Sequence, residues 1–102
     1  DAQHLVALDS DGRVIGTLLL LSFGDEAKIG RVVVAADRRR RGIASQMLQI
    51  ALTRAREQRF TRVRLAAQIV AVALYEQAGF AVESEPFEEA GIAHVWMGQE
   101  LV

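Results

Sequence analysis

The chain has 102 residues, of which 51% are hydrophobic, and a formal net charge of -1 at pH 7. These values predict one globular domain over residues 1–102 and argue against a nucleic-acid-binding surface. The absence of cysteine excludes disulfides, thiolate metal sites and a cysteine nucleophile. No basic-then-apolar leader and no apolar run near the roughly 18 residues of a membrane span is present. We expect a soluble, cytoplasmic protein without a membrane partner.

The first third of the chain predicts antiparallel strands. His4–Leu8 and Arg13–Leu21 are apolar runs, and Ser10–Gly12 between them has the composition of a turn. A second turn, Phe23–Glu26, leads into Ala27–Val34, which is apolar enough for a strand buried on both faces.

A helix is predicted over Gly42–Gln58, because its apolar residues recur at helical spacing. These residues are Ile43, Ala44, Met47, Leu48, Ala51, Leu52 and Ala55. The next apolar run, Arg62–Ala66, predicts a short strand. The step from the preceding strand through the helix to this one implies a right-handed crossover.

Ile69–Ala78 fits two interpretations. The part Ile69–Ala73 has strand propensity, whereas the residues that follow resemble a helix ending with Gly79 as its C-cap. We predict a helix.

A closing pair of strands is predicted over Ala81–Phe87 and Ile92–Val102, around a turn at Glu88–Gly91. Pro86 suits an edge or a bulge, since it has no N–H to donate. These elements together predict an α+β fold with a mixed, mostly antiparallel sheet and packed helices.

The segment Arg31–Ala44, R-V-V-V-A-A-D-R-R-R-R-G-I-A, predicts an anion site. A strand feeds a helix whose amino end is opened by Gly42 and preceded by arginines, so N–H groups, helix dipole and guanidinium groups all favour phosphate there. Neither a P-loop nor a spaced glycine triplet for a dinucleotide is present. The alternative is that the arginines form a solvated turn.

Two ordered motifs resemble the GNAT superfamily of N-acetyltransferases. Arg39–Ala44 is similar to its Arg/Gln-x-x-Gly-x-Gly/Ala signature, and Leu74–Phe80 resembles its second signature. Gly30–Val34, Ala67-Gln68 and Glu88–Met97 look more narrowly like the ElaA-like branch, a group of bacterial GNAT proteins. The resemblance covers essentially the whole chain.

The resemblance implies acetyl-coenzyme A (acetyl-CoA) as the acetyl donor, with no metal. The pantetheine arm would pair with the backbone of a strand that splays from Arg62–Ala66, and the loop would bind the pyrophosphate. The strand residues are Val32, Val33 and Val34, and the loop residues are Arg39, Arg40, Arg41, Gly42, Ile43 and Ala44.

The resemblance also implies direct attack of an amine on the thioester, without a covalent enzyme intermediate. The Val34 N–H would polarise the carbonyl oxygen, and Tyr75 would protonate the departing thiolate. The alternative for Tyr75 is that it only packs.

Other candidates carry two interpretations each. Gln68 stands where the second signature often supplies an amide to the cofactor arm, or it is a polar residue at a helix N-terminus. His94 is a candidate general base, or a packed or surface histidine. Glu88–Glu89 are a solvated hairpin tip, or they attract a cationic acceptor. Phe87 and Trp96 are interpreted as core or interface residues.

The start of the chain leaves alternatives open. GNAT proteins usually carry a strand and one or two helices before the position of Asp1, and the loop between those helices forms much of the acceptor pocket. Three further hypotheses are a non-catalytic acyl-CoA-binding module, a fragment of a longer acetyltransferase, and a nucleic-acid-binding domain that uses Arg38–Arg41. Exposed apolar sheet would favour a homodimer. The amine acceptor, a small molecule or a protein amine, cannot be read from the sequence.

Overall fold

The computed structural model describes residues 2–101 and contains one seven-stranded sheet in the order β1-β2-β3-β4-β7-β5, with β6 also paired to β7. The elements are β1 (Ala2–Leu8), β2 (Val14–Phe23), β3 (Glu26–Val34), η1 (Ala36–Arg38), α1 (Ile43–Glu57), β4 (Arg62–Gln68), η2 (Ile69–Ala71), α2 (Val72–Gln77), β5 (Ala81–Val82), β6 (Phe87–Glu89) and β7 (Ile92–Glu100). All neighbouring strands are antiparallel except β3 and β4. The predicted α+β fold is therefore confirmed.

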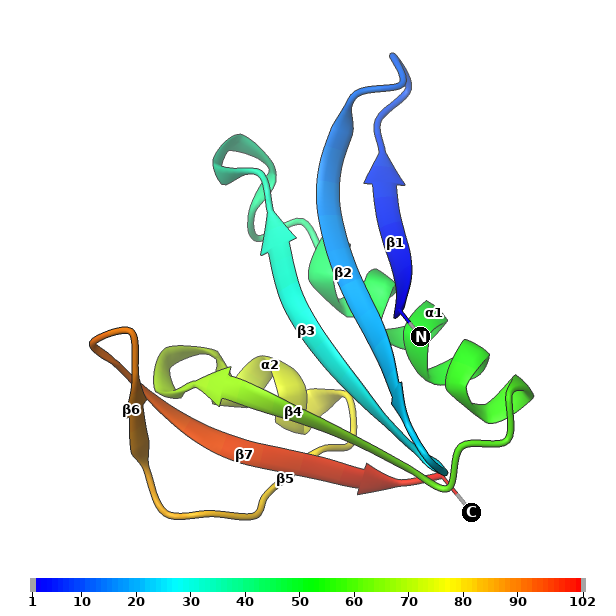
Figure 1. Cartoon of the computed structure of the whole chain (residues 1–102). Coiled ribbons are helices and arrows are strands. Elements are labelled where there is room, and N and C mark those ends of the chain that lie inside the picture. Colours follow the sequence, from blue (N-terminus) through cyan, green and yellow to red (C-terminus); the bar gives the residue numbers. More distant parts are fainter. Residues whose placement is uncertain (1, 102) are drawn as a thin grey trace.

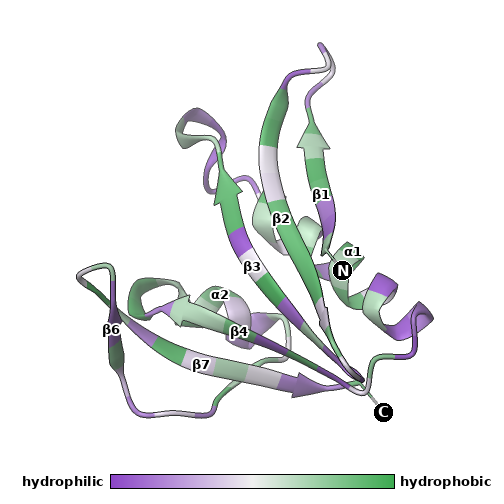
Figure 2. Ribbon diagram, in the orientation of Figure 1, coloured by the Kyte–Doolittle hydropathy of each residue, from purple (hydrophilic) through white to green (hydrophobic). Residues whose placement is uncertain are grey.

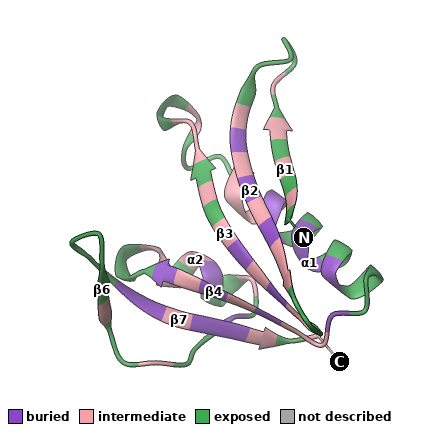
Figure 3. Cartoon of the chain, viewed as in Figure 1, coloured by how far each residue is buried: buried purple, intermediate pink, exposed green. Residues whose placement is uncertain are grey.

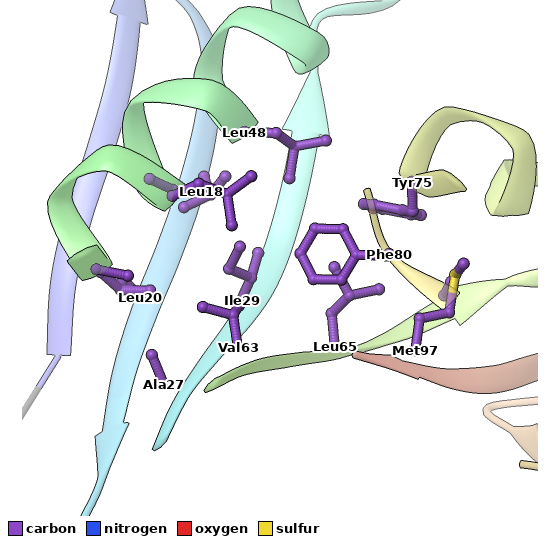
Figure 4. Packing of buried hydrophobic residues seen from close by; sticks show 14 of the residues in the cluster. Leu18, Leu20, Ala27, Ile29, Leu48, Val63, Leu65, Tyr75, Phe80 and Met97 are labelled. Carbon is purple, nitrogen blue, oxygen red and sulfur yellow. The ribbon is translucent and has the colours of Figure 1, made fainter. Parts of the chain in front are cut away.

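Both α-helices lie on the same face of the sheet, which leaves the opposite face open (Figure 1). We call these the helix face and the open face. The core lies between the helix face and the two α-helices, where buried side chains of the helices meet those of β2, β3, β4 and β7 (Figure 4). Apolar residues are concentrated in the strands and polar residues in the loops (Figure 2), and burial alternates along the central strands (Figure 3). None of the helices within residues 2–101 is long and apolar enough to cross a membrane.

The β1–β2 hairpin follows the predicted turn. The Oδ1 atom of Asp9 accepts the N–H groups of Asp11 and Arg13, each at 2.9 Å, and Gly12 adopts a φ of 81°. These local bonds hold the turn in place, since Asp favours such positions and glycine tolerates a positive φ.

The parallel pair β3–β4 separates after a few residues. Its register runs from Glu26↔Arg62 to Ile29↔Leu65 and then stops. Just beyond this point β3 contains a bulge against β2, and Arg31 there has a φ of 52°. Because a bulge bends a strand and increases its twist, the end of β3 turns away from β4, which opens the V-shaped gap in Figure 1.

The C-terminal third departs from the prediction in two places. Ala81–Phe87 is not one strand, because β5 ends at Val82 and β6 begins only at Phe87. In between, the Oγ atom of Ser84 accepts the N–H of Trp96 at 2.9 Å, and Pro86 has no N–H to offer. The pairing with β7 is therefore interrupted between Val82 and Phe87, and Pro86 lies in this interruption.

The second difference is the turn. Glu88 and Glu89 belong to β6, so the predicted turn at Glu88–Gly91 is too long. Ala90 and Gly91, with φ values of 52° and 76°, form the two-residue connection, as in tight hairpins with positive φ at both positions. The predicted helix at Ile69–Ala78 is confirmed, although its first turn is the 3₁₀ segment η2. Val102, the predicted end of the last strand, lies outside the described residues.

Candidate functional site

A cleft of about 730 Å³ lies where β3 and β4 diverge. Its lining comes from the end of β3, the end of β4, η2, α2 and the β6–β7 hairpin. A second hollow of about 350 Å³ lies at the start of α1 and shares Val34, Arg39, Ala44 and Leu74 with the cleft. The two hollows therefore form one groove from the N-terminus of α1 to β7.

The backbone of Val34 faces this cleft. The N–H of the next residue, Ala35, donates to the carbonyl oxygen of Ile15 on β2 at 2.8 Å. Because alternate residues of an antiparallel strand point their N–H and C=O groups in opposite directions, those of Val34 point away from β2. The carbonyl oxygen of Val34 accepts the Nε–H of Arg39 at 3.2 Å. Val32 and Val33 also line the cleft, so the three predicted valines lie together.

The predicted arginines do not share one position. Arg39 lines both hollows and Arg40 lines the second, whereas Arg41 is exposed and lines neither of them. Arg38 is held by Asp9, with Nη2 at 3.1 Å from Oδ2, and this ion pair connects the loop to the β1–β2 turn. Sequence reasoning missed this anchor, because Asp9 and Arg38 lie far apart in the chain.

The start of α1 offers unpaired N–H groups beside the second hollow. Gly42, Ile43 and Ala44 all line that hollow, and α1 begins at Ile43 without a side-chain cap. Gly42 has a φ of 76°, and a Cβ added to it would meet nothing within 4 Å. The positive φ favours glycine at this position, since other residues rarely adopt it.

Tyr75 both packs and lines the cleft. Its ring meets Phe80 edge to face, with centroids 6.2 Å apart, and only 8% of the residue is exposed (Figure 4). Its hydroxyl makes no hydrogen bond within residues 2–101 and is not a buried unsatisfied group, so it reaches the solvent of the cleft. Burial raises the pKa of Tyr75 above its ordinary value of 10.0, so the hydroxyl stays protonated at neutral pH.

An alkaline titration tests this environment directly, because Tyr75 is the one tyrosine in the chain. We expect the tyrosinate absorbance of the folded protein to rise with a midpoint above 10.0, and the unfolded chain to titrate at about 10. The folded state holds the hydroxyl proton of Tyr75 more tightly than the unfolded chain does. The contribution of this proton to the free energy of unfolding is therefore complete below about pH 10 and is lost as the pH rises through the pKa of Tyr75 in the folded state. A folded-state midpoint at or below that of the unfolded chain would contradict the placement.

His94 lines the cleft from β7 and is 8% exposed. Its Nδ1 lies 2.8 Å from the carbonyl oxygen of Ile92. Since a carbonyl oxygen only accepts, Nδ1 carries the hydrogen, and neutral His94 presents the lone pair of Nε2. That Nε2 lies 3.9 Å from Oε2 of Glu89, and the imidazole stacks on Phe87 with centroids 5.9 Å apart. The side chain of His94 is therefore packed, and its role as a general base stays a prediction.

Gln68 is exposed at the end of β4, opposite His94 in the ladder, and lines the cleft. Phe87 and Trp96 do not belong to the hydrophobic core, although core was one interpretation of both. They stack on each other with centroids 5.8 Å apart. Successive residues of a strand point to opposite faces of the sheet. The alternation in β7 could therefore have placed Trp96 on the face away from the buried Val95 and Met97.

Solved structures share this fold. A protein of Lactobacillus plantarum superposes with a TM-score of 0.91 at 27% identity, over 100% of this chain and 70% of its own. An acyl-CoA N-acyltransferase of Pseudomonas aeruginosa gives 0.87 at 32%, over 97% and 68%. Escherichia coli ElaA gives 0.88 at 26%, over 98% and 69%. The similarity to ElaA agrees with the branch that the motifs indicated.

A Bacillus subtilis acetyltransferase solved in complex with CoA shares the fold with a TM-score of 0.84 at 18% identity, over 99% of this chain and 78% of its own. The sequence is also 32% identical over 102 residues to a UPF0039 protein of Schizosaccharomyces pombe, covering 96% of this chain and 67% of that protein. The chain thus spans about two thirds of the length of the curated relatives it matches. The acetyltransferase (GNAT) domain family matches residues 1–101, and the chain therefore belongs to the GNAT family.

Proposed function

We propose that the chain transfers an acetyl group from acetyl-CoA to a primary amine by direct attack. The observation that carries this proposal is the continuous groove, which joins the N-terminus of α1 to a cleft lined by Tyr75 and His94. The fold is that of acyl-CoA N-acyltransferases, and the CoA complex of a fold relative supports the choice of donor.

The donor would bind along the groove in two parts. The pyrophosphate would accept hydrogen bonds from the N–H groups at the start of α1 and from Arg39 and Arg40 beside them. The pantetheine arm would lie along Val32–Val34, where the Val34 carbonyl oxygen now accepts the Arg39 side chain. We expect Arg39 to leave this carbonyl and turn to the phosphates when the donor binds.

The chemistry needs two proton movements, and the cleft has a group for each. The amine nitrogen forms a bond to the thioester carbon, and its proton passes to Nε2 of His94. The carbon–sulfur bond then breaks, and the thiolate takes the proton of the Tyr75 hydroxyl. A phenol suits this step because its ordinary pKa of about 10 lies near that of an alkyl thiol. The Val34 N–H would stabilise the negative carbonyl oxygen in between.

Isothermal titration of acetyl-CoA tests the donor site. We expect micromolar binding by the wild type and about tenfold weaker binding by Arg39→Ala, equivalent to about 1.4 kcal/mol. Arg56→Ala is the matched control, since it removes the same charge from an exposed position on α1 outside both hollows of the groove. No binding by a folded wild-type chain, or equal losses in the two variants, would contradict the proposal.

The hollow at the start of α1 could bind acyl-CoA without any transfer, so one other candidate is an acyl-CoA-binding module that does not transfer the acetyl group. Release of CoA thiol in the presence of a panel of primary amines separates the two. Binding without release for every amine supports the non-catalytic alternative, and release with any amine supports the transferase.

A further inference from the structure

A cluster of cationic and aromatic side chains lies on the open face, next to the cleft. It consists of Lys28, Arg64, Phe87 and Trp96, and we call it the cation–aromatic patch. Lys28 and Arg64 are register partners on β3 and β4, with Nζ and Cζ at 5.1 Å and 4.7 Å from the ring centroid of Trp96. Phe87 stacks on the same indole. The indole of Trp96 thus holds two positive charges side by side.

Strands β3 and β4 both run from the cation–aromatic patch to the cleft. Because residues two apart share a face of a strand, Lys28 is followed by Gly30, and Arg64 by Ala66. Both Gly30 and Ala66 line the cleft, and a Cβ added at Gly30 would meet nothing within 4 Å. A small apolar path of roughly 6–7 Å, two residues of strand rise, therefore joins the cleft to the two cations.

At the patch end of this path, Lys28 and Arg64 are available to bind an anion. Within residues 2–101, neither Lys28 nor Arg64 forms an ion pair, whereas Arg62 on the same strand pairs with Glu83 and Glu100. A small hollow of about 220 Å³ adjoins Lys28, Arg64 and Trp96, and its one lining acid is Glu26, the register partner of Arg62.

At the cleft end, Glu89 is the one acidic residue of the described lining, which also contains Arg31 and Arg39. Glu89 lines the cleft beside His94, with Oε2 at 3.9 Å from Nε2. An ammonium group beside His94 is attracted to the Glu89 carboxylate, and a carboxylate at the patch is attracted to Lys28 and Arg64.

We propose that the acetyl acceptor is a primary amine that carries a carboxylate on a short apolar body. The amine lies between His94 and Glu89, the body crosses Gly30 and Ala66, and the carboxylate binds Lys28 and Arg64. Both cations are half-buried, so water screens them less than it screens the exposed arginines of the loop. This inference rests on the proposed function, since it names the acceptor class for the same cleft.

The test compares two probes that differ only in charge, 4-(aminomethyl)benzoate and 4-(aminomethyl)benzamide. With saturating acetyl-CoA, we expect kcat/KM for the acid to exceed that for the amide by about tenfold or more, since a charge-assisted bond adds to the acid alone. The variant Lys28→Gln/Arg64→Gln should remove this preference, and Arg56→Gln should keep it. Glutamine retains much of the length of both side chains, and single variants serve if the double variant does not fold.

A second readout does not need catalysis. Trp96 is the one tryptophan in the chain, so its fluorescence reports binding at the patch. We expect the acid to change this emission at about tenfold lower concentration than the amide, and the double variant to respond equally to both.

The outcomes separate the acceptor site from the transferase activity. Equal kcat/KM for acid and amide in the wild type overturns the carboxylate site and leaves the transferase standing. A preference that survives in Lys28→Gln/Arg64→Gln overturns it as well. If acetyl-CoA binds but neither these probes nor any amine of the panel is acetylated, the proposed transferase is contradicted, and the Trp96 titration alone decides the site.

Discussion

The Tyr75→Phe variant is expected to bind acetyl-CoA like the wild type and to transfer the acetyl group about a hundredfold more slowly, the lower end of the range for general acids. Phenylalanine keeps the ring that packs against Phe80 and removes only the hydroxyl that reaches the cleft. The thiolate would then leave without a positioned proton donor. Steady-state release of CoA thiol, with an accepted amine at saturation, gives kcat for both proteins.

The leaving group supplies the control for this prediction. An acetyl thioester of a more acidic thiol needs less protonation as it departs, so the gap between Tyr75→Phe and the wild type should narrow. The melting temperature should change little, because the buried ring is conserved. An unchanged kcat, or a loss that follows a fall in melting temperature, would assign Tyr75 to packing alone.

Local patterns account for the parts of the fold that the sequence predicted correctly. Helix α1 is visible because its apolar residues repeat at helical spacing, and the β1–β2 hairpin because Asp and Gly fix the turn within a few residues. The basic loop followed by glycine is also a local pattern, and the anion site that it indicates stays a prediction. In each case the determining contacts are close in the chain.

The feature that opens the cleft has no such local signal. Arg31 adopts a positive φ, which is uncommon for arginine, and nothing in its neighbours predicts a bulge there. The splaying of the two strands could be expected only from the resemblance to GNAT proteins. The break between β5 and β6 could not be predicted from the sequence either. There the Oγ atom of Ser84 accepts the N–H of Trp96, a residue that is distant in the chain.

The site residues also divide into those that a local sequence pattern predicts and those that depend on distant parts of the chain. Arg39 could be placed because it stands beside the helix start, but the sequence could not tell it from Arg41, which points into neither hollow. The patch formed by Lys28, Arg64 and Trp96 requires the parallel register of β3 with β4 and the antiparallel register of β4 with β7. A single sequence does not specify such a register over long separations.

The Leu48→Ala variant is expected to lose about 3 kcal/mol of unfolding free energy, within the usual range of about 2–5 kcal/mol for a buried leucine. Leu48 is 0% exposed and projects from α1 toward the sheet (Figure 4). Small domains have a total stability of about 5–15 kcal/mol, so the melting temperature should fall by about 10 °C or more. Thermal and urea unfolding of both proteins gives the difference.

Ile50→Ala separates this packing effect from the properties of the helix itself. Ile50 lies on α1 but is 53% exposed, so its loss should change stability by at most about 0.5–1 kcal/mol. Equal destabilisation by the two variants would contradict the position of the core. Neither substitution alters the N–H groups at the start of α1, so we expect saturating acetyl-CoA to raise the melting temperatures of Leu48→Ala and of the wild type alike. If the ligand stabilises the wild type but not Leu48→Ala, the packing of α1 on the sheet must also hold the phosphate site in its binding geometry.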